Sequence, residues 1–110
     1  MKNAHLETII KTAREQSAPI WKRVGRELSG ARRRYPAVNL AKIEKYGKKE
    51  LVVVVPGKVL GTGQITKQTV VAVSFSKIAL AKIKKSGGTA ELLESYILKN
   101  KEGKKVQLLK

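Results

Sequence analysis

A run of five consecutive aliphatic residues, 51–55, constrains the fold of this chain more than any other feature. Four of the five are valines, whose branched side chains favour extended backbone. Because successive side chains of a strand point to opposite faces, an unbroken aliphatic run is typical of a strand that is covered on both faces. We expect Pro56 and Gly57 to bound this strand, and residues 58–60 to form a short partner strand.

Two amphipathic helices are expected before this strand. Apolar residues at positions 6, 9, 10 and 13 follow helical spacing, and a second stripe at positions 20, 24 and 28 follows Pro19 and ends near Gly30. The other face of the second helix carries Lys22, Arg23 and Arg26. This helix should therefore turn its apolar side to the protein interior and its cationic side outward.

Helices and strands alternate after residue 37. The sequence predicts a short strand passing into a helical turn at 38–46, a glycine turn at 61–63, a buried strand at 69–75, a helix capped by Ser76, a last helix opened by Thr89 and Glu91 with Leu92 on its buried stripe, and a terminal strand at 105–109. This order indicates an α/β fold in one domain, residues 1–110, with residues 1–36 as a basic helical arm and loop.

Charge indicates the kind of partner. The 24 lysines and arginines face only 8 acids, and a formal charge of +16 hinders the compact state unless a polyanion neutralises it. All six arginines lie between positions 14 and 34, and Arg32, Arg33 and Arg34 form an unbroken run before Tyr35. Guanidinium groups suit paired phosphate oxygens, so the run favours a nucleic-acid contact over the alternative, a solvated surface loop.

Enzyme chemistry has little raw material in this sequence. The chain has no cysteine or aspartate and one histidine, so no triad or metal-ligand cluster is evident. The glycines at 57–63 lack the spacing of a phosphate-binding or dinucleotide loop and are expected to form tight turns. We also find no signal peptide and no apolar run that is long enough to span a membrane. We therefore expect a soluble protein with no catalytic residue, metal, cofactor, membrane partner or small-molecule substrate.

The aromatic residues divide into two groups. Trp21, Tyr46, Phe75 and Tyr96 fall on apolar stripes or at strand ends, so we expect them in the core. Tyr35 is the exception, because it follows the arginine run and is placed to stack on an unpaired base.

Two segments resemble a known family: RELSGARRRYPAVNLAKI at 26–43 and LVVVVPGKVLGTGQI at 51–65. The chain is similar to the archaeal large-subunit ribosomal protein L eighteen e, a distant relative of bacterial large-subunit protein fifteen, over nearly its whole length. The resemblance implies an irregular superhelix of strand-strand-helix units and a structural, non-enzymatic protein of the cytoplasmic ribosome. Its expected partners are large-subunit ribosomal RNA and neighbouring ribosomal proteins, without intrinsic homo-oligomers.

Together the charge pattern and the resemblance give a set of expected RNA-binding residues. They lie on the second helix, in the arginine loop, in the segment after it and in the turn that follows the aliphatic strand: Lys22, Arg23, Arg26, Arg32, Arg33, Arg34, Tyr35, Asn39, Lys42 and Lys58. A DNA-compacting architectural protein is the alternative, because charge alone supports it equally well.

Overall fold

The computed structural model describes residues 4–30 and 37–110. Its centre is strand β2 (Val52–Leu60), which pairs in parallel with β3 (Thr69–Phe75), and β3 pairs in parallel with β4 (Thr89–Leu92). On the other side of β2, β1 (Ala37–Asn39) pairs with its end and β5 (Val106–Leu108) with its beginning, again in parallel. The structure thus confirms the α/β class, with β2, β3 and the helix after them forming a strand-strand-helix unit.

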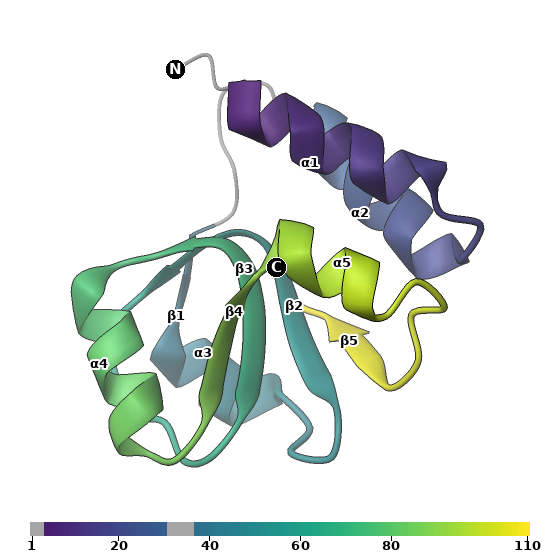
Figure 1. Cartoon of the computed structure of the whole chain (residues 1–110). Helices are drawn as coiled ribbons and strands as arrows, with labels where there is room; N and C mark the ends of the chain where they lie inside the picture. Colours follow the sequence, from purple (N-terminus) through teal and green to yellow (C-terminus); the bar gives the residue numbers. More distant parts are fainter. Residues whose placement is uncertain (1–3, 31–36) are drawn as a thin grey trace.

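Helices cover both faces of the sheet, as the aliphatic run predicts. Val53 and Val55 belong to a core cluster with α3 (Leu40–Tyr46) and α4 (Lys77–Lys85). Val54 and Val71 belong to the other cluster, with α1 (Ala4–Glu15), α2 (Pro19–Gly30) and α5 (Leu93–Lys99). Figure 1 shows these three helices on one side of the sheet and α3 and α4 on the other. The alternation of side chains along β2 therefore gives the molecule three layers.

Strand β2 does not end at Pro56 and Gly57. It continues to Leu60, and the register with β3 shifts between Val55, opposite Ala72, and Lys58, opposite Ser74. Three steps along β2 thus match two along β3, which is a bulge that accommodates a proline without a backbone donor. The predicted boundary, the separate partner strand at 58–60 and the turn around Lys58 are therefore wrong.

The predicted start of the last helix is also wrong. Thr89–Leu92 forms β4, which pairs with β3 from the register of Thr69 with Thr89 onward, and α5 begins only at Leu93. Leu92 is 48% exposed, so it does not belong to the buried stripe, which holds Leu93 and Ile97. The hydrogen bonds offered by the free edge of β3 outweigh the local capping pattern of Thr89 and Glu91.

The other expected elements are confirmed. Both N-terminal helices, the passage from β1 into α3, and the terminal strand β5 are present. Ser76 caps α4, because its hydroxyl accepts a hydrogen bond from the Ala79 amide at 3.1 Å.

Trp21 attaches the two N-terminal helices to the rest of the protein. Its side chain is fully buried, and its Nε1 donates a hydrogen bond to the Asn100 carbonyl at 2.7 Å. The Tyr96 ring meets it edge to face, with centroids 6.1 Å apart. Gly103, with φ of +68°, lets the chain pass close to Ile20 beside this ring. One side chain thus joins α2 to α5 and to the loop that follows.

Replacing Trp21 with alanine should lower the free energy of unfolding by about 3 to 5 kcal/mol, because it empties a large aromatic site in the core. Trp21→Phe should cost less, since it keeps an aromatic ring and loses the bond to Asn100. Urea unfolding would measure both, and equal losses for the two variants would contradict this account.

Glu44 ties α3 to the segment before β3. Its carboxylate accepts hydrogen bonds from the Lys49 ammonium at 2.6 Å and from the Thr66 amide and hydroxyl at 3.0 Å each. The bond from Lys49 is the largest cause, and the Thr66 amide the next, that lowers the pKa of Glu44 from 4.5 to about 2. The charged carboxylate is therefore the form that this junction holds.

Because the pKa of Glu44 is lowered on folding, its contribution to stability is present above pH 4.5 and is lost as pH falls toward about 2. Glu44→Gln should lower the unfolding free energy at neutral pH by less than about 1 kcal/mol, since the pair is solvent-exposed. The difference from wild type should shrink through the acid range in urea titrations. Glu50→Gln is the matched control, and a pH-independent difference for Glu44→Gln would refute the assignment.

Candidate nucleic-acid interface

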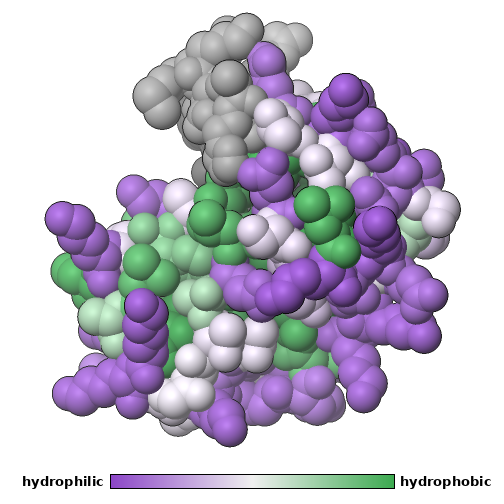
Figure 2. All heavy atoms as spheres, in the orientation of Figure 1, coloured by the Kyte–Doolittle hydropathy of each residue, from purple (hydrophilic) through white to green (hydrophobic). Residues whose placement is uncertain are grey.

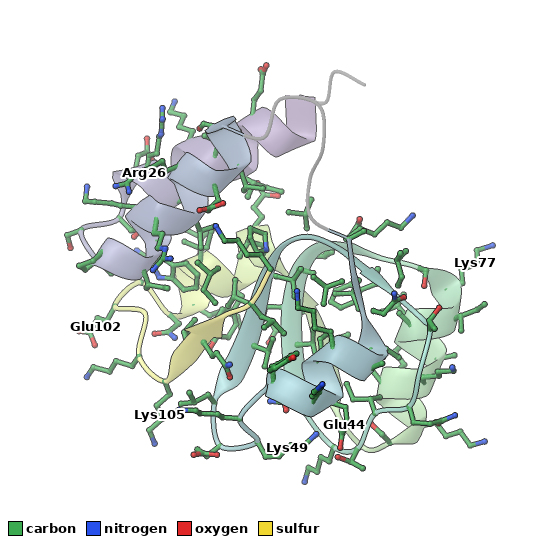
Figure 3. All side chains as sticks on the ribbon, turned by 180° about the vertical axis from the view of Figure 1, so that it is seen from behind. Arg26, Glu44, Lys49, Lys77, Glu102 and Lys105 are labelled. Carbon is green, nitrogen blue, oxygen red and sulfur yellow. The ribbon has the colours of Figure 1, made fainter. Side chains whose placement is uncertain are left out.

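The outer face of α2 is cationic. The helix buries Trp21, Val24 and Leu28 against the sheet, while Lys22, Arg23 and Arg26 are all exposed. None of the three forms an ion pair with a described residue. Figure 3 shows Arg26 on the outside of this helix, and Figure 2 shows hydrophilic residues gathered over the α1 and α2 layer. Like charges at i and i+4, as in Lys22 and Arg26, repel one another unless an anion lies between them.

Arg14 of α1 extends this surface, although the sequence analysis did not include it among the binding residues. Helices α1 and α2 approach closely at Gly25, where an added Cβ would lie 2.9 Å from the Arg14 Cγ. Arg14 is exposed and therefore lies across α2, close to the turn that carries Arg26. A glycine one residue before an exposed arginine on the second helix is the only sequence signal for this contact.

Arg32, Arg33, Arg34 and Tyr35 lie outside the described residues, so their predicted role stays a prediction. The two ends of their segment are placed: α2 ends at Gly30, and β1 begins at Ala37. Ala37 is opposite Lys58 in the register of β1 and β2, and Lys58 is exposed. The structure therefore places Lys58 where the arginine segment meets the sheet.

Asn39 and Lys42 have surroundings that the sequence did not reveal. Asn39 precedes α3 without capping it, and its Oδ1 is buried with no hydrogen-bond partner. The Lys42 ammonium donates a hydrogen bond to the Lys110 carbonyl at 2.7 Å, and Lys110 in turn pairs with Glu27 at 2.6 Å. Lys42 is thus exposed but partly engaged by the protein itself.

The glycine turn is structural and does not have the geometry of a phosphate cradle. Residues 61–68 return the chain to the parallel strand β3 without a helix, and Lys82 of α4 holds this connection. Its ammonium donates to the carbonyls of Gly61 and Gly63 at 2.8 and 2.9 Å. Gly63 adopts a φ of +98° against Ala41. Carbonyls that accept from a lysine leave this loop without the array of amide donors that a phosphate needs.

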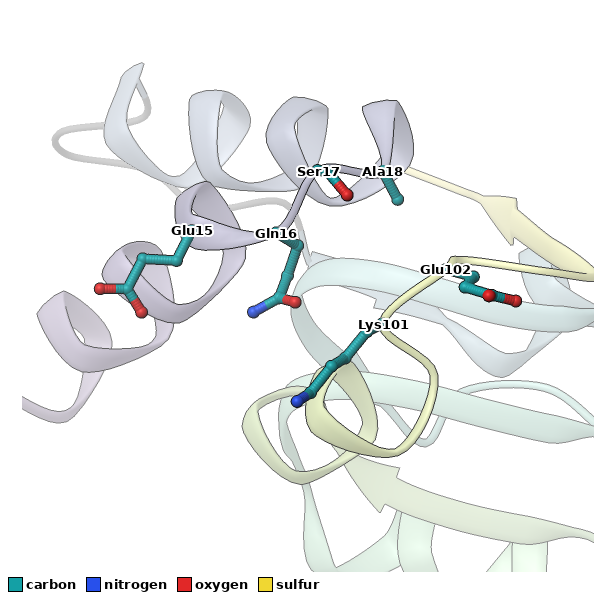
Figure 4. A pocket seen from close by; sticks show the side chains of 6 residues that line it. All are labelled: Glu15, Gln16, Ser17, Ala18, Lys101 and Glu102. Carbon is teal, nitrogen blue, oxygen red and sulfur yellow. The ribbon is translucent and has the colours of Figure 1, made fainter.

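A surface hollow lies between the α1–α2 connection and the loop after α5. It is lined by Glu15, Gln16, Ser17, Ala18, Lys101 and Glu102. Figure 4 shows Glu15 and Glu102 on opposite sides of it, pointing away from each other. Paired carboxylates for acid–base chemistry are therefore not assembled in this hollow.

Two searches of the described residues concern other kinds of site. Residues 4–30 and 37–110 contain no group of three or more histidine, cysteine, aspartate or glutamate side chains that could hold a metal ion. No helix in the same part of the chain is long and apolar enough to cross a membrane.

The aromatic residues follow the expectation with one exception. Trp21 is buried, and Phe75 and Tyr96 are partly buried against the two core clusters. Tyr46, in contrast, is 53% exposed, so its predicted place in the core is wrong. The reason is its position at the last residue of α3, where the apolar stripe of Leu40 and Ile43 has already turned away.

Comparison with known proteins identifies relatives over nearly the whole chain. Residues 27–91 match the family of ribosomal proteins that comprises L15 and L18e of the 50S subunit and their counterpart in the 60S subunit. The chain is 42% identical to the large ribosomal subunit protein eL18 of Archaeoglobus fulgidus over 105 residues, which cover 94% of this chain and 90% of the relative. It is 46% identical to the protein of the same name from Sulfurisphaera tokodaii over 109 residues, covering 98% and 92%.

Fold and surface define a small cationic α/β protein with helices on both faces of a parallel sheet. The chain belongs to the large-subunit ribosomal protein family that these comparisons identify, and the resemblance seen in its sequence is confirmed. The comparisons give no support to the alternative of a DNA-compacting protein.

The two carbonyls held by Lys82 predict a difference between structural and surface lysines. Lys82→Met should lower the free energy of unfolding by about 1 to 3 kcal/mol, the range for hydrogen bonds to a charged donor. Lys84→Met, an exposed lysine of the same helix, is the matched control and should stay within about 0.5 kcal/mol of wild type. Thermal unfolding would test this, and equal stability of the two variants would refute it.

Proposed function

We propose that this protein is a structural, non-enzymatic constituent of the large ribosomal subunit of the cytoplasmic ribosome, and that it holds neighbouring segments of ribosomal RNA together. The observation that carries the proposal is the arrangement of cations on α1 and α2. Arg14, Lys22, Arg23 and Arg26 are exposed and lack ion pairs within the described residues, on helices whose other sides are buried in the core. Membership of a ribosomal protein family indicates that the missing countercharge is ribosomal RNA.

The rigidity of this surface supports an RNA contact that reads shape. Phosphate contacts carry no sequence information by themselves, so specificity must come from the fold of the RNA. A helix layer fixed to the sheet through Trp21 presents its cations in a constant spacing. Lys58, at the base of the arginine segment, adds a cation from the sheet, and we propose that Arg32, Arg33, Arg34 and Tyr35 continue the contact.

The partners follow from the same reasoning. We propose that the whole chain acts as one domain between ribosomal RNA and neighbouring large-subunit proteins. No cofactor, small-molecule substrate or second copy of the chain is part of the proposal.

Replacing Arg32, Arg33 and Arg34 together with alanine should weaken binding to large-subunit ribosomal RNA and incorporation into subunits, with the fold intact. If the wild-type protein contacts roughly 6 to 10 phosphates, its affinity for a double-stranded fragment should fall about a thousandfold or more between roughly 50 and 200 mM salt. The variant should show a shallower salt dependence in filter binding. Unchanged affinity and an unchanged salt slope would refute the role of this segment.

Two further variants locate the contact. Lys22→Ala, Arg23→Ala and Arg26→Ala combined should reduce the salt slope as well, while alanine preserves the helix. The control removes the same charge elsewhere, with Lys99→Ala, Lys101→Ala and Lys104→Ala, and should bind more like the wild type. Equal binding of duplex DNA and ribosomal RNA at matched salt would instead favour a DNA-compacting protein.

A further inference from the structure

Tyr46 presents an aromatic ring to solvent at the end of α3. The ring is 53% exposed, and the Lys45 ammonium lies 5.3 Å from its centroid. The residues of α3 that point inward, Leu40 and Ile43, are fully buried. The ring is therefore outside the core that accounts for this helix, and packing inside the protein does not explain it.

Hydrogen bonds fix the backbone under this ring. The Tyr46 carbonyl accepts from Gln107 Nε2 at 2.9 Å, and the Gln107 Oε1 accepts from the Lys48 amide at 2.8 Å. Gly47 closes α3 with its amide on the Ile43 carbonyl at 2.7 Å, and an added Cβ there would lie 3.0 Å from Val53 Cγ2. Strand β5 and strand β2 thus hold the end of α3 in place, so the ring projects from a rigid base.

Lysines surround the ring. Lys45, Lys48 and Lys105 are exposed and have no ion pair within the described residues, whereas Lys49 is paired with Glu44. The Leu51 amide donates to the Lys48 carbonyl and the adjacent Val52 amide to the Lys105 carbonyl, which places the two lysines at the same end of β2. Figure 3 shows Lys49 and Lys105 along this edge of the molecule. An aromatic ring among unpaired ammonium groups suits a nucleotide, whose base stacks and whose phosphate is anionic.

We propose that Tyr46 is a stacking platform for an unpaired RNA base, with Lys45, Lys48 and Lys105 placed to contact the adjoining phosphates. Lys45 beside the ring does not satisfy the site, because base–aromatic stacking is stronger than an exposed cation–π contact. A single-stranded loop or bulge of ribosomal RNA is the occupant that combines an accessible base with the negative charge required here.

This contact would be separate from the one at the arginine segment. That segment meets the sheet at the level of Lys58, whereas Gly47 lies against Val53, five residues earlier on β2. At about 3.3 Å per residue the two levels are roughly 17 Å apart along the strand. The inference rests on the proposed function, since it supplies the second contact by which one rigid body could hold two RNA segments.

The test is binding of the full chain to large-subunit ribosomal RNA transcribed from an archaeal gene. Tyr46→Ala and Tyr46→Leu should each weaken binding by about 5- to 100-fold, the effect of losing one stacked base, with the salt slope unchanged because the stack is not ionic. Tyr46→Phe should bind as the wild type. Lys45→Ala combined with Lys48→Ala should instead lower the salt slope. Ultraviolet irradiation of the complex should yield a nucleotide adduct on Tyr46 by mass spectrometry.

The outcomes separate this inference from the proposed function. If the wild type binds the RNA with a steep salt slope and Tyr46→Ala binds equally well, the stacking platform is refuted and the proposed function stands. If the wild type does not bind structured RNA, both fail. If Tyr46→Ala binds naked RNA normally but is lost from assembled subunits, the ring contacts a protein neighbour and the stacking proposal is overturned.

Discussion

Burial of β2 on both faces is the constraint on which the rest of this structure depends. A strand with valines on each side must be covered twice, and a chain of this length can do so only with helices on either face of a parallel sheet. Val53 and Val55 require α3 and α4, and Val54 requires α1, α2 and α5. Once the apolar sides of these helices are committed to the sheet, their polar sides must form the surface, which fixes where the cations are displayed.

The cations do not all serve the same purpose. Lys82 holds the connection between β2 and β3, and Lys42 and Lys110 fasten α3, the end of the chain and Glu27 of α2 to one another. Others, such as Arg23 and Arg26, make no ion pair with a described residue. Net charge alone would count these groups as equal, but only the second kind is fully available to a polyanion. The excess of +16 is therefore an upper limit on the charge that RNA can neutralise.

Two features place cationic groups at two levels of the same strand. The bulge at Pro56 and Gly57 lets β2 continue to Lys58, beside the start of β1, and the end of α3 brings Tyr46 next to the start of β2. Because β2 is the most deeply packed element, neither level can move without disturbing the core. A rigid body with contacts at both levels is suited to fixing the relative position of RNA segments.

The sequence by itself determined the fold class, both N-terminal helices, the helix capped by Ser76 and the outward direction of Lys22, Arg23 and Arg26, because hydrophobic periodicity and caps are local signals. Only the tertiary structure decided three features. Pro56 stays within a strand because β3 accepts a bulge, Thr89–Leu92 becomes a strand because β3 offers a free edge, and Tyr46 is exposed because α3 ends there. Each depends on a partner distant along the chain or on the last turn of a helix, and such contacts leave no periodic trace in the sequence.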